Sequence, residues 1–137
     1  MIDYDATIAA LESQDSFDIE FAEENEESYF FTIKVKQRKQ RRLINRYIRT
    51  IAERKKDASD DDDMQIEITT GFYELGIALA EDCIAWQNIT GDFTKAKAKR
   101  WMELNGAAAE ELGRQFKDKL DEYETILRKH REVLVKN

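Results

Sequence analysis

The chain has 137 residues, a length that suits one domain with a single hydrophobic core. Hydrophobic residues make up 42% and charged residues 37% of the chain, which excludes a disordered chain and requires a mostly ionic surface. The net charge is −7, and the one cysteine, Cys83, excludes an internal disulfide and fits a reducing compartment. No run of about 18 apolar residues exists that would cross a membrane, and residues 1–5 are acidic rather than signal-like. We expect a cytoplasmic protein.

The net charge hides four blocks of alternating sign. Residues 1–33 carry −10, residues 34–56 carry +10, residues 57–93 carry −10 and residues 94–137 carry +3. We favour the interpretation that these blocks neutralise one another in the folded domain. The alternative is that at least one block is displayed to a partner.

The first 35 residues predict a short helix followed by two strands. Residues 4–13 are rich in helix formers and follow a capping aspartate. Two later runs alternate between apolar and other residues, with apolar positions at Phe17, Ile19 and Phe21 and then at Tyr29, Phe31, Ile33 and Val35. An acidic loop joins them, so we expect a β-hairpin. Residues 64–68, with Met64, Ile66 and Ile68 in alternation, are a weaker candidate for a third strand.

Residues 37–56 predict a helix with one apolar stripe and a very basic remainder. The apolar positions are Leu43, Ile44, Tyr47, Ile48 and Ile51. Five arginines occupy much of the remaining surface and are the candidate partner-binding residues: Arg38, Arg41, Arg42, Arg46 and Arg49. A solvated or self-neutralised face is the simpler interpretation of this helix, and an acidic partner is the functional one.

The second half predicts an acidic linker and three further helices. The composition of residues 57–64 predicts a mobile acidic linker. Residues 70–88 predict a helix whose apolar stripe includes Cys83 and Trp86, so Cys83 reads as a core residue rather than a reactive thiol. Thr94 is a candidate cap for a short basic helix that stops near Asn105 and Gly106.

A long last helix is predicted over residues 107–135. Its apolar face comprises Ala109, Leu112, Phe116, Leu120, Tyr123, Leu127 and Leu134. This face would suit either packing on the hairpin or formation of a homo-oligomer. The expected fold is therefore α+β and mostly helical, a single domain over residues 1–137 in which an N-terminal β-hairpin packs against about four helices.

No combination of residues has the spacing of a catalytic, cofactor or metal site. His130 stands without a nearby carboxylate to orient it, the Asp60–Asp63 run lacks the glycine and terminal glutamate of a calcium loop, and no glycine-rich phosphate loop occurs. We expect no enzyme activity, no cofactor and no metal. The acidic balance of the chain argues against nucleic acid as the partner of the basic helix, although Tyr47 would offer a base something to stack on.

One segment resembles a known family. The residues are Ala85-Trp86-Gln87-Asn88-Ile89, then a Gly91-Asp92 turn and Phe93-Thr94, and they follow acidic hairpin strands and a basic helix. This order resembles the small tail assembly chaperones of long-tailed bacteriophages, in which a Gly-Trp-Glu-Asn-Val-like segment precedes an acidic glycine turn and a Phe-Thr helix start. The present chain has Ala85 and Gln87 at the positions that flank the tryptophan.

The resemblance implies a non-catalytic factor of the infected bacterium's cytoplasm that binds the tape-measure or tail-tube protein and is missing from the finished virion. We therefore expect a protein-binding chaperone. Two alternatives stay open. The acidic segments 12–27 and 57–67 would let the chain act as an inhibitor or regulator that imitates a phosphate backbone and blocks a nucleic-acid-binding enzyme, as anti-defence proteins do. The third possibility is a structural component of the virion.

Overall fold

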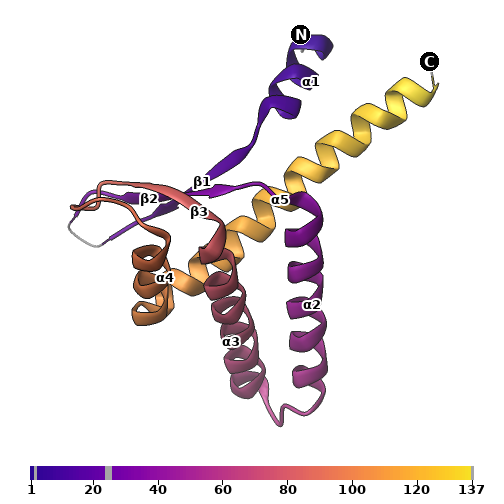
Figure 1. Cartoon of the computed structure of the whole chain (residues 1–137). Coiled ribbons are helices and arrows are strands. Elements are labelled where there is room, and N and C mark those ends of the chain that lie inside the picture. Colours follow the sequence, from indigo (N-terminus) through magenta and orange to yellow (C-terminus); the bar gives the residue numbers. More distant parts are fainter. Residues whose placement is uncertain (2, 24–25, 137) are drawn as a thin grey trace.

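A computed structural model describes residues 1, 3–23 and 26–136, with side chains except those of 11–13, 130–131 and 133–136. The described part is α+β and mostly helical, as predicted, with a three-stranded antiparallel sheet and a long C-terminal helix (Figure 1). The elements in chain order are α1 (Tyr4–Ser13), β1 (Ser16–Phe21), β2 (Tyr29–Lys34), α2 (Gln37–Lys56), α3 (Asp61–Leu79), the short 3₁₀ turn η1 (Ala80–Asp82), β3 (Cys83–Gln87), α4 (Lys95–Leu104) and α5 (Gly106–Lys136).

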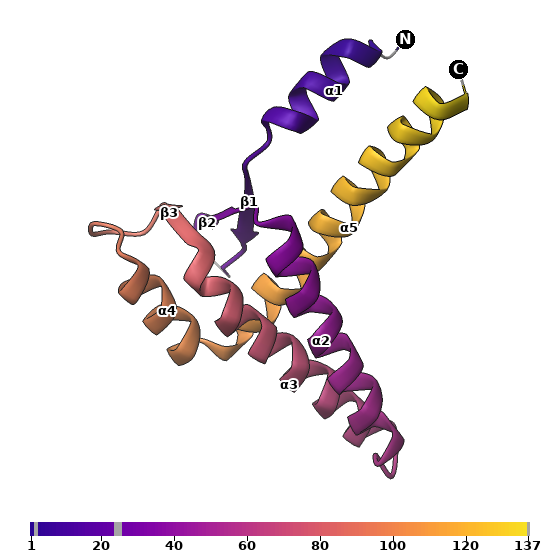
Figure 2. The ribbon, with the colours of Figure 1, turned by 45° about the vertical axis from the view of Figure 1, so that its right-hand side comes forward.

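The predicted hairpin forms from β1 and β2, and β3 pairs with the other side of β2. Alternate residues of the first two strands are buried, among them Ile19 paired with Phe31. The intervening residues face the other way, where the Thr32 hydroxyl donates to Asp18 Oδ1 at 2.7 Å. One face of the sheet therefore carries the apolar side chains and the helices pack on that face (Figures 1 and 2).

The weaker candidate for a third strand, residues 64–68, was wrong. Met64, Ile66 and Ile68 lie in α3, and Ile66 is 60% exposed rather than paired in a sheet. The helix begins early because the Asp60 side chain caps it, accepting from the Asp63 amide at 2.8 Å, and because acidic residues in a first turn suit the helix dipole.

The same cap changes the extent of the predicted acidic linker. Residues 61–64 belong to α3, so the connection between α2 and α3 is short, and it lies at the lower tip of the helical hairpin in Figure 1. Asp57 already closes the end of α2, where its amide donates to the Arg54 carbonyl at 3.1 Å and the next amide, of Ala58, donates to the Lys55 carbonyl at 3.2 Å. The acidic run thus acts mainly as the end of one helix and the start of the next.

The predicted helix over residues 70–88 is wrong in its second half. It ends at Leu79, and Cys83 and Trp86 lie on β3 instead, opposite Ile33 and Phe31 respectively. Their spacing continued the helical stripe only by coincidence, because the strand presents both side chains to the same core from a different backbone. The prediction that Cys83 is a core residue is confirmed, since it is fully buried.

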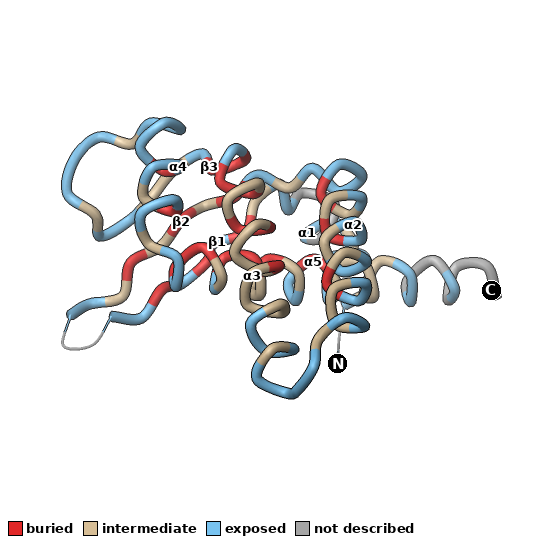
Figure 3. Tube along the Cα trace, turned by 90° about the horizontal axis from the view of Figure 1, so that it is seen from below, coloured by how far each residue is buried: buried red, intermediate tan, exposed pale blue. Residues whose placement is uncertain are grey.

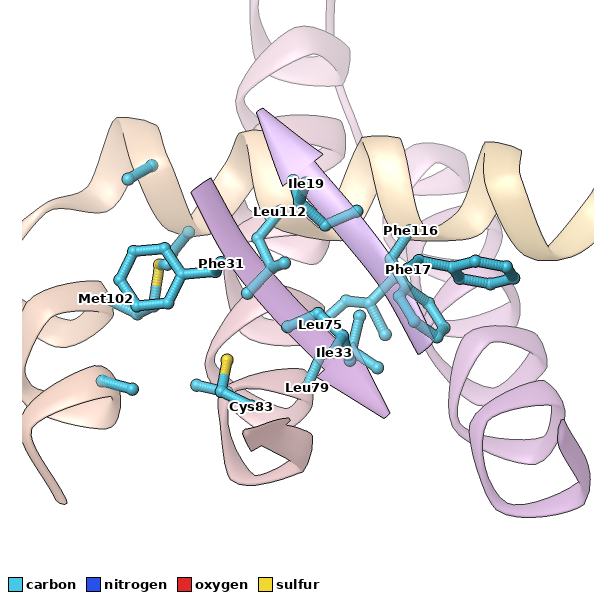
Figure 4. Packing of buried hydrophobic residues seen from close by; sticks show 14 of the residues in the cluster. Phe17, Ile19, Phe31, Ile33, Leu75, Leu79, Cys83, Met102, Leu112 and Phe116 are labelled. Atoms are coloured by element: carbon cyan, nitrogen blue, oxygen red, sulfur yellow. The ribbon is translucent and has the colours of Figure 1, made fainter. Parts of the chain in front are cut away.

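The core lies between the sheet and the crossing of α3 with α5 (Figure 4). Phe17, Ile19, Phe31 and Ile33 of the sheet meet leucines and a phenylalanine of the two helices: Leu75, Leu79, Leu112 and Phe116. Two glycines let the helix backbones approach closely. A Cβ on Gly76 would collide with the Ala109 carbonyl, and one on Gly113 would collide with the Phe72 carbonyl.

The helix α2 lies beside α3, and α5 continues past the sheet (Figures 1 and 2). The C-terminal part of α5 and the helix α1 both extend from the body on the same side of the molecule. The side chain of Leu134, the last predicted member of the α5 apolar face, lies outside the described residues. The outer side of α2 is exposed along the helix, as the pale blue segments in Figure 3 show.

Candidate functional site

The helix α2 has the expected boundaries, residues 37–56, and packs through one side only. Ile44 and Ile51 are buried, and Leu43 and Tyr47 pack against the core. Ile51 also contacts Gly71 of α3, where a larger side chain would have no room. The apolar stripe fixes which side of the helix faces the protein, so the basic residues divide between the rim of this contact and the solvent.

At the start of α2, two lysines and a glutamine hold a buried carboxylate. The Asp82 side chain is only 1% exposed and lies 2.9 Å from Lys39 Nζ and 3.1 Å from Lys36 Nζ. Gln40, also buried, donates to Asp82 Oδ2 at 3.1 Å and to the Lys34 carbonyl at 2.7 Å. Burial on its own raises the pKa of Asp82, but the hydrogen bonds from Lys39, Lys36 and Gln40 outweigh it and the pKa is lowered.

Arg41 is joined to α5 rather than offered to a partner. Its guanidinium lies 2.7 Å from Asp121 Oδ1 and 3.1 Å from Glu124 Oε2. Asp121 also accepts from Lys117 at 2.7 Å, and these two cations lower its pKa although partial burial acts in the opposite direction. We therefore remove Arg41 from the set of candidate partner-binding residues, because its charge is already neutralised.

Near the other end of α2, Arg54 lies 3.5 Å from Glu74 and 3.8 Å from Glu67, both on α3. Lys39, Arg41 and Arg54 are thus each paired with a carboxylate from outside the basic block. For these residues the expectation of mutual neutralisation between charge blocks is met.

The remaining four candidate arginines are different. Arg38, Arg42, Arg46 and Arg49, here called the arginine stripe, are all exposed, and none forms an ion pair or side-chain hydrogen bond with another residue that the structure describes. At about 100° per residue they fall within an arc of about 80°, and at about 1.5 Å per residue they span about 16 Å along the axis. They therefore share the solvent side of α2.

The charges of the arginine stripe disfavour the α2 helix. The first turn of α2 has no acidic residue, and the N-cap Lys36 makes no side-chain capping bond. Cations at a helix N-terminus oppose the helix dipole, and like charges four residues apart repel. Asp82 lies beside Lys36 and Lys39 at the start of α2, and Glu53 follows Arg49 by one helical turn, but among the described residues neither carboxylate forms an ion pair with the stripe.

The other titratable groups form no catalytic arrangement among the described residues. Burial raises the pKa of the Cys83 thiol to about 12, so it stays protonated and unreactive near neutral pH. The described side chains include no group of three histidine, cysteine or acidic residues that would hold a metal ion. The side chain of His130 lies outside the described residues.

A hollow lies between the hairpin and the start of α5. Glu20, Glu23 and Glu111 lie around it, with Tyr29 and Ala108 at its base. Gln115 bridges its wall by donating to the Glu20 carbonyl at 2.7 Å. The described residues that line it include no lysine, arginine, histidine or cysteine.

The segment that carries the family resemblance forms a turn between β3 and α4. Trp86 Nε1 donates to the Gly91 carbonyl at 3.1 Å, and its ring meets Phe93 edge-on at 5.4 Å between centroids. Thr94 caps α4 by accepting from the Lys97 amide at 3.1 Å, which confirms the predicted cap. Asn88 and Gly91 adopt positive φ angles of 62° and 106°. Trp86 therefore fixes a local structure rather than an exposed binding surface.

Comparisons with protein-family models, curated proteins and solved structures found no match to this chain. Among the helices within the described residues, none combines the length and apolar character needed to span a membrane. The arginine stripe is consequently the candidate functional site that rests on this molecule's own geometry.

Proposed function

We propose that the chain is a non-catalytic factor that binds another protein through the outer face of α2. The observation that carries this proposal is the contrast along one helix. Lys39, Arg41 and Arg54 at the rim of α2 pair with carboxylates, whereas the arginine stripe is exposed and forms no ion pair with a residue that the structure describes. Exposed arginines that share one side of a helix can bind the carboxylates of a partner protein through charge-assisted hydrogen bonds.

Within this class we propose a tail assembly chaperone of a long-tailed bacteriophage, acting in the host cytoplasm on the tape-measure or tail-tube protein. The support is the resemblance in residues 85–94 together with the order of elements around them. These residues form a compact turn held by Trp86 and closed by the Thr94 cap. The partner assignment rests on the resemblance alone.

The proposal is tested by co-expressing the chain with tape-measure or tail-tube proteins encoded beside its gene. We expect the tagged chain to retain one of them on an affinity column and to increase its soluble yield. A variant with the four stripe arginines changed to glutamate should lose this retention.

A matched control is available on α4, where Lys95, Lys97, Lys99 and Arg100 are also four exposed cations. Changing them to glutamate gives the same change in net charge and should leave retention intact. Loss of retention in both variants would indicate a general charge effect and contradict a binding face on α2.

The alternatives give different results. An acidic inhibitor of a nucleic-acid-binding enzyme would depend on the hairpin acids, including the exposed Glu23, Glu26 and Glu27, and not on the arginine stripe. Detection of the chain in purified virions would contradict the chaperone and favour a structural component.

A further inference from the structure

We propose that the arginine stripe binds an acidic α-helix of the partner protein, whose carboxylates lie along α2 at four-residue spacing. This inference rests on the proposed function, because it specifies the partner of the same surface. The bound segment is acidic in composition and helical in backbone.

The spacing of the stripe favours a helix over an extended segment. Three of its residues are four apart and the fourth is three further on, so the row rises in steps of about 6, 6 and 4.5 Å. A facing helix with glutamate or aspartate at the same intervals repeats these steps, and each guanidinium meets a carboxylate. Side chains on one face of an extended strand repeat about every 7 Å and would reach about 20 Å over four positions, out of step with a row of about 16 Å.

The surroundings of the stripe favour a narrow anionic partner over a nucleic acid duplex. Glu53 and Asp57 are exposed at the C-terminal end of α2. Asp121 and Glu124, beside Arg41, are 41% and 23% exposed on the adjoining helix. A duplex much wider than α2 would bring phosphates against these carboxylates, whereas a single helix of about 10 Å diameter can follow the row and end before Glu53, one turn beyond Arg49.

Single-stranded nucleic acid is disfavoured for a second reason. Such strands bind through aromatic side chains on which bases stack as well as through cations. Tyr47, the aromatic residue of α2, packs against the core on the opposite side of the helix from the stripe. The stripe therefore offers anion-binding groups without a stacking surface.

The test uses two synthetic peptides of identical composition, rich in alanine and glutamine with four glutamates each. In the first, the glutamates have the spacing of the stripe and share one helical face, and in the second they are distributed around the helix. We expect the first peptide to bind the full-length chain at least tenfold more tightly in titration calorimetry. We also expect its helical circular dichroism to increase on binding, and its affinity to fall at least tenfold between low salt and 0.3 M salt.

Two variants separate recognition from folding. Changing the four stripe arginines to glutamine should abolish peptide binding while the melting temperature stays equal to or above that of the unchanged chain. The α4 control variant, with Lys95, Lys97, Lys99 and Arg100 changed to glutamine, should bind the first peptide as before. Loss of binding accompanied by a lower melting temperature would show a structural role and overturn the inference.

Other results also overturn it. Equal binding of the two peptides would show attraction to any polyanion, and displacement of the first peptide by equimolar single- or double-stranded DNA would assign the stripe to nucleic acid. Retention of a tail protein by the glutamate variant of the stripe would refute this inference but leave the proposed function standing through another surface. Failure of the unchanged chain to retain any tail protein would refute the proposed chaperone function, whatever the peptides show.

Discussion

The positive charges at the rim of α2 form ion pairs, and those on its outer face do not. At the rim, Asp82, Asp121, Glu124 and Glu74 each accept from a cation of the helix across a tertiary contact. On the outer face, the four arginines form no ion pair with a described residue, and Glu53 follows Arg49 on the same face of the helix. The same residue types thus serve the fold on one side of a helix and are left for solvent or a partner on the other, and mutations should separate the two roles.

The largest effect is expected at the buried end of the rim. Asp82→Ala removes the carboxylate that Lys36, Lys39 and Gln40 contact, and it leaves the buried Gln40 amide short of an acceptor. Because the lysines are half-exposed and can turn to water, we expect a loss of about 2–3 kcal/mol in the free energy of unfolding rather than the larger cost of a fully buried pair. Urea denaturation measures it.

The neighbouring Glu81 is 61% exposed and only 3.7 Å from a lysine, so Glu81→Ala is the matched control, with an expected change below about 0.5 kcal/mol. Equal effects of the two substitutions would show that burial of Asp82 contributes nothing.

Lowering the pH should remove part of the contribution of Asp82 to the free energy of unfolding. The pKa of Asp82 in the folded protein lies below its ordinary value of 3.8, so the carboxylate stabilises the fold above that pH and loses this effect as the pH falls through the folded pKa. The stability difference between the unchanged chain and Asp82→Ala should be constant from about pH 7 to 5 and shrink below about pH 4. Urea midpoints across this range measure it, and a difference that grows on acidification would contradict the assignment.

A smaller effect distinguishes two adjacent arginines. Arg41→Gln breaks the contacts with Asp121 and Glu124 and should cost about 1 kcal/mol, while Arg42→Gln should change stability by less than about 0.3 kcal/mol. The two variants have the same charge and lie on the same turn of the helix, so each controls for the other. Equal losses in chemical denaturation would mean that the rim and the outer face do not differ.

The smallest expected effect has the opposite sign. Arg38→Gln removes a positive charge from the N-terminal turn of α2, where it opposes the helix dipole, and should raise the free energy of unfolding by about 0.3–0.5 kcal/mol. Thermal unfolding at low ionic strength would detect the gain, which added salt should reduce. A loss of stability would place Arg38 among the residues that support the fold.

Local patterns were enough to predict the fold class, the hairpin and the basic helix. The alternation of Phe17, Ile19 and Phe21 and the stripe through Ile44 and Ile51 state which side of each element is buried. The third strand was misplaced because a strand of five residues is too short to set its own period. Cys83 and Trp86 continue the spacing of the preceding helix by coincidence, and the Asp60 cap at the true start of α3 lies within an acidic run whose composition is typical of a linker.

The candidate site was predicted as a set of five arginines, and the structure divides the set. Arg41 and Arg42 are adjacent, and the sequence predicts the same partner-binding role for both. The structure pairs Arg41 with carboxylates on a helix about 80 residues later in the chain. The contact between Gln40 and Asp82 also joins residues far apart in the sequence. No local sequence pattern predicts that a glutamine is buried. Which cations are neutralised is decided by tertiary packing, which periodicity does not report.

Both tryptophans lie at the same end of the molecule, so tryptophan fluorescence reports on that end only. Trp86 packs against Phe31 and Phe93, and Trp101 packs against Tyr29 and Phe31, so both indoles lie around the sheet and α4. Their fluorescence will report the loss of the core on unfolding. A partner that docks along α2 should leave the emission spectrum unchanged, and a spectral shift on binding would therefore reveal that the opposite end of the protein responds to the partner.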